Sequence, residues 1–74
     1  MDNNLLETFK DFGATLRQMR LAERLTQQQV AAKIGITYQA YQAYELGITL
    51  PTLENFIKLC MFFDITPNDI LGIK

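Results

Sequence analysis

Histidine is absent from this 74-residue sequence, and cysteine occurs once, at Cys60. This inventory excludes disulfide frameworks, zinc sites and cysteine–histidine catalysis. A glycine-rich phosphate loop and a close carboxylate pair in a cleft-like context are also missing, so little catalytic material is present. We therefore expect no enzyme, no metal, no cofactor and no small-molecule ligand. Cys60 stands among apolar residues and is expected to be a small buried hydrophobe.

Long apolar runs are missing as well. No stretch approaches the ~20 apolar residues that a membrane span needs, and no signal-peptide layout opens the chain. The sequence therefore predicts a cytoplasmic protein without membrane contact. Its 74 residues leave room for one domain, residues 1–74. Hydrophobic residues make up 49% of the chain, enough for a compact core and for some apolar side chains to meet a partner.

The chain also lacks net positive charge. Its formal net charge is −1 and its pI is near 5.1, whereas nucleic-acid-binding domains are usually basic. The charges are unevenly distributed, however, because the acids lie mostly towards the two ends. The segment 17–33 holds four cations against the single acid Glu23: Arg17, Arg20, Arg24 and Lys33. Such a local positive face is compatible with DNA binding through few phosphate contacts, with modest affinity and a shallow salt dependence.

Residues 26–47, TQQQVAAKIGITYQAYQAYELG, have the pattern of two short helices joined by a tight turn. Thr26 and Gln29 form a capping box at the start of the first helix, predicted over residues 27–33. Three apolar residues then mark one buried face: Val30, Ala31 and Ile34. Gly35 ends this helix, because glycine enters the left-handed conformation without steric cost.

The second helix of the pair is predicted over residues 38–46, between the cap Thr37 and the terminating Gly47. On a wheel of ~100° per residue, one side carries Tyr41, Tyr44 and Glu45. We expect the two tyrosines to face the core, each with a hydroxyl that needs a partner. The opposite side carries Gln39, Gln42, Ala43 and Leu46. The whole stretch therefore predicts a helix-turn-helix.

Three further helices complete an all-α bundle of five helices with short connections. A helix over about residues 5–22 has an apolar face made of Leu5, Phe9, Phe12, Leu16 and Met19. A helix over residues 53–63 follows the cap Thr52, with an apolar stripe of Leu53, Phe56, Ile57, Cys60 and Phe63. A last helix over residues 67–71 starts with proline at its first position and buries Ile70 and Leu71.

Five segments resemble the phage-repressor-like (Cro/XRE-type) helix-turn-helix DNA-binding domains: FGATLRQMR, LTQQQVAAKIGIT, YELG, LPTLENFIKLC and ITPNDIL. They stand in the family's order and spacing, from about Phe12 to Leu71. The resemblance implies a five-helix lambda-repressor-like fold in which helices 2 and 3 form the helix-turn-helix. It also implies a homodimeric transcriptional regulator that places helix 38–46 in the major groove of double-stranded DNA.

Four residues of helix 38–46 are candidate base contacts. A glutamine amide can donate to and accept from adenine at once, so Gln39 and Gln42 are candidates for direct readout. Ala43 is a candidate for contact with a thymine methyl, and Tyr38 for contact with a base or a phosphate. Each is also an ordinary residue of an exposed helix. The absence of Lys and Arg here favours either an A·T-leaning site or a weakened DNA role.

Five residues are candidate phosphate contacts: Gln27, Thr37, Arg17, Arg24 and Lys33. Gln27 follows the Thr26 cap, where the resemblance implies a glutamine that binds a phosphate beside the positive end of the helix. Thr37 caps its helix in either case, and the three cations are otherwise solvated charges. The resemblance gives Arg20 and Glu45 a structural role, as a buried ion pair that fixes the angle of the recognition helix.

Two positions leave alternatives open, and a third departs from the residue usual in the family. Gly13 marks either a close packing contact or the boundary between a loose leading turn and the first helix. Asp64 replaces the family's usual glycine, so that turn either differs or tolerates a small strain. Tyr41 stands where the family usually has a smaller branched aliphatic residue.

Two functions compete. The first is a sequence-specific regulator, a homodimer that reads a pseudo-palindromic operator with half-sites about 34 Å apart. Its dimer contact is expected among the surplus apolar residues Leu46, Ile48, Met61, Phe62 and Ile73. The second is a protein-interaction module on the same fold, an antitoxin-like or antirepressor partner, which the acidic pI and the uncharged recognition helix favour.

Overall fold

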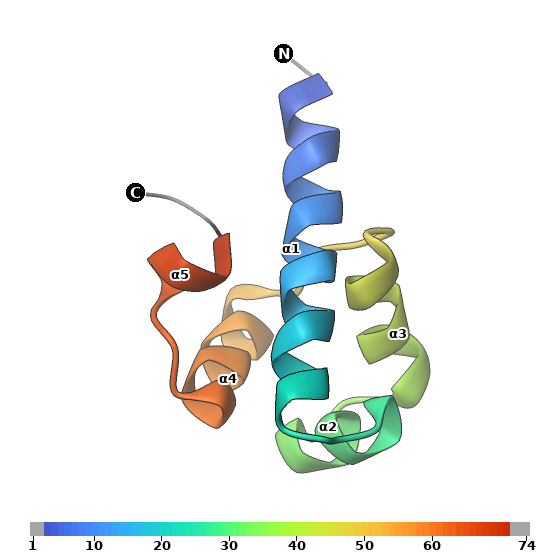
Figure 1. The fold of residues 1–74 in the computed structure, drawn as a ribbon. Helices are drawn as coiled ribbons and strands as arrows, with labels where there is room; N and C mark the ends of the chain where they lie inside the picture. The colour runs from blue at the N-terminus through green and yellow to red at the C-terminus, as the bar shows by residue number, and fades with distance from the viewer. Residues whose placement is uncertain (1–2, 72–74) are drawn as a thin grey trace.

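The computed structural model describes residues 3–71 of the chain, with the side chains of residues 7–71 (Figure 1). These residues form five helices and no strand: α1 (Asn3–Ala22), α2 (Gln27–Ile34), α3 (Tyr38–Leu46), α4 (Leu53–Phe63) and α5 (Pro67–Leu71). The all-α, five-helix fold expected from the sequence is confirmed. None of the described helices is both long and apolar enough to cross a membrane.

The helix bounds differ from the predicted ones at two places. Helix α1 begins at Asn3, earlier than the predicted start near residue 5. Helix α2 includes Ile34, one residue beyond its predicted end, because Gly35 is the residue that leaves the helix, at φ 77°. Helices α3, α4 and α5 have the predicted bounds.

The helix starts follow from their capping residues. The Gln29 N–H donates to Thr26 Oγ1 at 3.1 Å, and the Thr26 N–H donates to Gln29 Oε1 at 2.8 Å. This completes the predicted capping box of α2. Thr37 caps α3 and Thr52 caps α4 in the same way, each accepting a backbone N–H three residues further on. Local chemistry thus sets where the short helices begin.

Among the described residues, two that are not glycine adopt the left-handed conformation. Asp64 ends α4 at φ 54° and ψ 55°, and Arg24 follows the last turn of α1 at φ 58°. Asp64 therefore makes the turn that a glycine would make and tolerates the strain. The left-handed conformation costs a residue with a Cβ about 1–2 kcal/mol, which packing elsewhere must offset.

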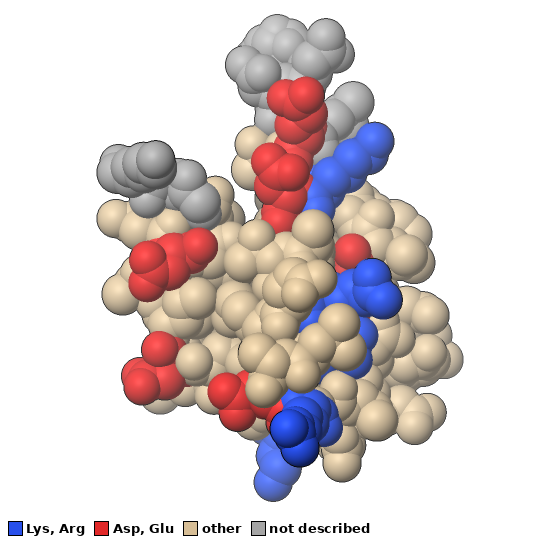
Figure 2. All heavy atoms as spheres, viewed as in Figure 1, with Lys and Arg blue, Asp and Glu red and all other residues tan. Residues whose placement is uncertain are grey.

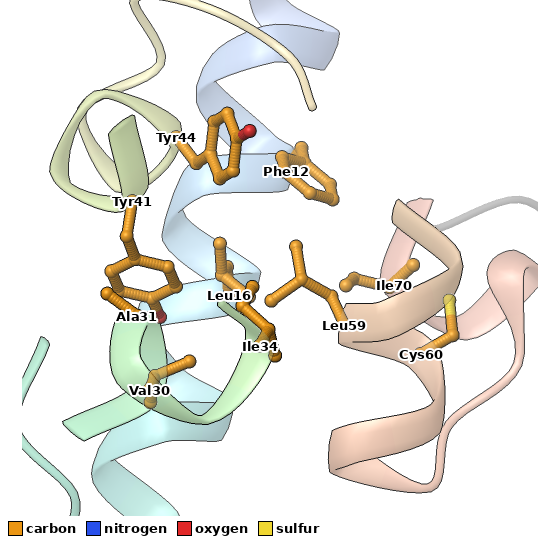
Figure 3. Close-up of a cluster of buried hydrophobic side chains, with 10 residues drawn as sticks. All are labelled: Phe12, Leu16, Val30, Ala31, Ile34, Tyr41, Tyr44, Leu59, Cys60 and Ile70. Atoms are coloured by element: carbon orange, nitrogen blue, oxygen red, sulfur yellow. The ribbon is translucent and has the colours of Figure 1, made fainter. Parts of the chain in front are cut away.

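The core lies between α1 and the other four helices, as Figure 3 shows. Ten hydrophobic side chains are buried there: Phe12, Leu16, Val30, Ala31, Ile34, Tyr41, Tyr44, Leu59, Cys60 and Ile70. Burial also raises the pKa of the Cys60 thiol.

The predicted apolar stripe of α4 is partly wrong. Leu53 and Ile57 are 74% and 48% exposed, whereas Leu59, absent from the predicted stripe, is fully buried. Eight of the eleven residues of α4 are apolar or cysteine, in the sequence LENFIKLCMFF, so more than one helical face could have been buried. The buried face of α4 is the one that carries Leu59 and Cys60.

Gly13 allows α1 and α3 to approach closely. A Cβ placed on Gly13 would lie 2.5 Å from the Glu45 carbonyl oxygen and 2.6 Å from that of Tyr44. Real Cβ atoms do not come that near to backbone oxygen, so any larger residue would push α3 away. Because α1 continues through Gly13 without a break, the close packing contact is the correct alternative.

Candidate nucleic-acid interface

Helix α3 packs against α1 and α2 (Figure 1), and its Tyr44 is hydrogen-bonded to Asn55 of α4. Its inner side carries Tyr41 and Tyr44, both buried, as the helical wheel predicts. Their rings meet edge to face, with centroids 6.4 Å apart. The two tyrosines anchor α3 to the core and leave its other side free to face a ligand.

The Glu45 carboxylate, on the inner side of α3, accepts four hydrogen bonds. Its Oε2 accepts from Arg20 Nε at 2.7 Å and from the Tyr41 hydroxyl at 2.5 Å. Its Oε1 accepts from Arg20 Nη2 at 3.0 Å and from Gln27 Nε2 at 2.9 Å. Arg20 Nη1 also donates to the Leu25 carbonyl at 2.9 Å. This set of residues, the Glu45 network, joins α1, α2 and α3.

Within the Glu45 network, Arg20 and Glu45 remain ionised at neutral pH. Burial raises the pKa of Glu45, but the hydrogen bonds from Arg20, Tyr41 and Gln27 and the Arg20 charge outweigh it, so the pKa lies below its usual value. The hydrogen bond to Glu45 raises the pKa of Arg20. Burial, followed by the bond to Glu45, raises the pKa of Tyr41. The side chains of Arg20 and Glu45 are 10% and 3% exposed, so the pair is buried.

The four candidate base contacts all lie on α3, and they differ in how far their side chains are exposed to solvent. Gln39 is exposed, whereas Tyr38, Gln42 and Ala43 are half-buried. Gln42 Nε2 donates to the Tyr38 hydroxyl oxygen at 3.3 Å. The outer side of α3 therefore presents two carboxamides: that of Gln42 is held by Tyr38, and that of Gln39 has no hydrogen-bond partner among the described residues.

The candidate phosphate contacts are spread over three helices. Gln27 begins α2 and Thr37 caps α3, whereas Arg17 lies on α1 and Arg24 follows that helix. Lys33 lies in the last turn of α2, beside Lys58 and Met61 of α4. Arg17, Arg24, Lys33 and Thr37 are exposed, while Gln27 is half-buried with its amide bound to Glu45. A hollow of about 430 Å³ opens beside the start of α2, lined by Arg20, Leu25, Thr26, Gln27, Gln28 and Tyr38.

The charges separate on the surface (Figure 2). Lys and Arg gather mainly over the lower half of α1 and over α2, on the side towards α3. Asp and Glu lie mainly over α4 and α5 and at the upper end of α1, although blue and red atoms stand side by side at both ends of α1. The net acidity of the chain thus leaves a basic band beside α3.

Sequence reasoning missed three hydrogen bonds that fix α3, and one of them is the bond from Gln27 to Glu45. The Tyr41 hydroxyl donates to Glu45, and a signal existed, since the two residues stand four apart on one helical face. Asn55 Nδ2 of α4 donates to the Tyr44 hydroxyl at 3.1 Å, for which the sequence holds no comparable signal.

Comparisons with known proteins agree with this geometry. A protein-family model described as Helix-turn-helix matches residues 16–70. The uncharacterized HTH-type transcriptional regulator YobD of Bacillus subtilis (strain 168) is 40% identical over 78% of this chain and 52% of its own length. YqaE of the same strain, with the same description, is 38% identical over 81% of this chain and 52% of its length.

A phage protein is similar to the same degree. The cryptic phage CTXphi transcriptional repressor RstR of Vibrio cholerae serotype O1 (strain ATCC 39315 / El Tor Inaba N16961) is 39% identical over 77% of this chain and 51% of its own length. The chain thus spans about half the length of these three relatives.

Proposed function

The chain belongs to the helix-turn-helix family of the Cro/C1 (XRE-like) type, and from that premise we propose that it is a sequence-specific regulator of transcription. Its target is double-stranded DNA, read through the major groove by α3. Relatives described as transcriptional regulators and as a phage repressor support this proposal.

The observation that carries the proposal is the division of α3 into two sides. The inner side is fixed by Tyr41, Tyr44 and the Glu45 network, while the outer side presents Gln39 and Gln42. An α-helix with its side chains is about 10–12 Å across, so α3 can enter a major groove about 12 Å wide. Two outward carboxamides suit adenine, whose N7 and N6 atoms form an acceptor–donor pair.

The remaining proposed contacts position the domain on the DNA. Arg17, Arg24 and Lys33 supply charge to phosphates, and Thr37 and Gln27 supply polar groups at the helix starts. Gln27 uses one N–H for Glu45 and keeps a second N–H for a phosphate oxygen. Each phosphate neutralised contributes a salt slope of about 0.9, so the few cations imply a shallow salt dependence.

We also propose a homodimer on a pseudo-palindromic site with half-sites about 34 Å apart. Three residues expected to supply the dimer contact, Leu46, Ile48 and Met61, are exposed. Phe62 is half-buried with its ring against Phe63, which leaves less of it for a partner, and Ile73 lies outside the described residues. Sedimentation at about 0.1 mM, alone and on DNA, tests this part, because a strict monomer in both conditions contradicts it.

Selection of binding sites from a random duplex DNA library tests the main proposal, with wild type and Gln39→Ala run in parallel. A palindromic motif that loses information at one position in the variant supports direct readout and orients α3. No enriched motif at low salt rejects the proposal.

The second candidate is a protein-interaction module on the same fold. An apolar hollow of about 310 Å³ favours it, lined by Phe12, Leu50, Pro51, Leu53, Phe56 and Leu71. The absence of Lys and Arg from α3 also favours a protein-interaction module. Affinity capture tests this candidate. Recovery of one stoichiometric protein without enriched DNA would support the protein-interaction module over the DNA-binding regulator.

A further inference from the structure

One hydrogen bond joins two residues on the outer side of α3. Gln42 Nε2 donates to the Tyr38 hydroxyl oxygen at 3.3 Å, across one turn of the helix. We infer that Tyr38 does not read a base itself but is a positioning residue that holds Gln42 for base readout. This inference rests on the proposed DNA-binding function and assigns different roles to two residues of the same site.

The two side chains differ in conformational freedom. The more rigid Tyr38 therefore holds the more flexible Gln42 in place. A tyrosine ring has two rotatable side-chain bonds and is rigid beyond them, whereas a glutamine loses much rotamer freedom when it is ordered. Tyr38 is also half-buried, at the first position of α3 directly after the Thr37 cap. Its hydroxyl is therefore a fixed point for the longer side chain one turn further on.

The hydrogen bond leaves Gln42 able to recognise a base. A carboxamide has two N–H groups and one oxygen, and Tyr38 takes only one N–H. Within the described part of the chain, the Gln42 carboxamide makes no other hydrogen bond. The remaining N–H and the oxygen match adenine N7 and the adenine N6 amino group.

Gln39 provides an internal comparison. It is exposed, and among the described residues its side chain has no hydrogen-bond partner. Gln39 must therefore be ordered by the DNA, whereas Gln42 is ordered in advance, and pre-ordered groups bind at a smaller entropic cost. Loss of the Tyr38 hydroxyl should weaken readout by Gln42 and leave readout by Gln39 unchanged.

The test is site selection from a random duplex library with wild type, Gln42→Ala, Tyr38→Phe and Tyr44→Phe. Gln42→Ala identifies the base position that Gln42 reads. Tyr38→Phe should lose information at that same position, and its affinity for the wild-type site should fall about fivefold, the worth of one hydrogen bond.

Tyr44→Phe is the matched control. It also removes from α3 a hydroxyl that accepts an amide N–H, here from Asn55 at 3.1 Å, but on the buried side of the helix. The selected motif should stay unchanged in this variant. Thermal melting of each variant ensures that selection is run on folded protein.

The outcomes separate the hypotheses. Information lost by Tyr38→Phe at a position other than that of Gln42 would show that Tyr38 reads a base directly, which overturns the inference. An unchanged motif and unchanged affinity in Tyr38→Phe also overturn it. If wild type selects no motif, the proposed DNA-binding function fails instead.

Discussion

Helix α3 is held by charge on one side and by neutral contacts on the other. Towards α1 and α2, the Glu45 carboxylate accepts three hydrogen bonds, two from Arg20 and one from Gln27, and it accepts a fourth from Tyr41 of α3 itself. Towards α4, the Tyr44 hydroxyl accepts a single amide N–H from Asn55. Buried charges are costly when a partner is lost, whereas a neutral hydrogen bond is worth about 1 kcal/mol. The angle of α3 should therefore depend mainly on the Glu45 network.

The largest loss of stability is expected when Glu45 loses its cationic partner, Arg20. Arg20→Met leaves a buried carboxylate without a counter-charge and should lower the free energy of unfolding by about 3–5 kcal/mol. Lys58→Met is the control, because its ion pair with Glu54 lies on the surface, where the loss should stay below about 1 kcal/mol. Urea titration measures both variants, and similar losses in the two would remove the contrast between buried and exposed pairs.

The two sides of α3 can be compared directly through the stability of variants that each lack one tyrosine hydroxyl. Tyr41→Phe deletes a donor to a charged acceptor and should cost about 1.5–3 kcal/mol. Tyr44→Phe deletes a neutral hydrogen bond and should cost about 0.5–1.5 kcal/mol. Both variants keep the buried ring, so packing is matched. A larger loss in Tyr44→Phe than in Tyr41→Phe, measured in the same urea titrations, would reverse the proposed order.

The Glu45 network should also make stability depend on pH. The pKa of Glu45 is lower in the folded chain than in the unfolded chain, where it is about 4.3. The unfolded state therefore binds the proton first, and the stabilisation is present above pH about 4.3 and is lost as pH falls through the folded pKa. Wild type should lose more stability than Glu45→Gln between pH 6 and pH 3. Equal slopes in the two proteins would exclude this role for Glu45.

The smallest changes in stability are expected at Arg24 and Asp64, which adopt the left-handed backbone conformation without being glycine. Arg24→Gly and Asp64→Gly should each relieve strain and raise the free energy of unfolding by about 1 kcal/mol. Only Arg24→Gly should weaken DNA binding, since Arg24 is a proposed phosphate contact and Asp64 lies at the end of α4. Equal affinity for DNA in the two variants would remove Arg24 from the interface.

The sequence predicts the helices well because local chemistry defines their ends. Thr26, Thr37 and Thr52 each accept a backbone N–H at a helix start, and Gly35 and Gly47 end α2 and α3 at positive φ. These interactions span three or four residues, so they can be read without knowledge of the tertiary structure.

The packing of the predicted helices is less accessible from the sequence. Helix α4 is apolar on most sides, so its pattern does not show that Leu59 is buried while Leu53 is exposed. The hydrogen bond of Glu45 with Gln27 depends on how α2 and α3 meet, and that of Tyr44 with Asn55 depends on how α3 and α4 meet. A buried tyrosine requires a partner, but only the packed structure identifies which one.

Readout of DNA by the outer side of α3 is tested most directly by equilibrium binding of wild type and Gln39→Ala. Each protein is titrated with the selected site and with a scrambled duplex between 50 and 200 mM salt. Direct readout predicts that the variant loses about 1–3 kcal/mol on the selected site and nothing on the scrambled duplex, with the same salt slope. An equal loss on both duplexes, or no loss on either, would contradict base readout by α3.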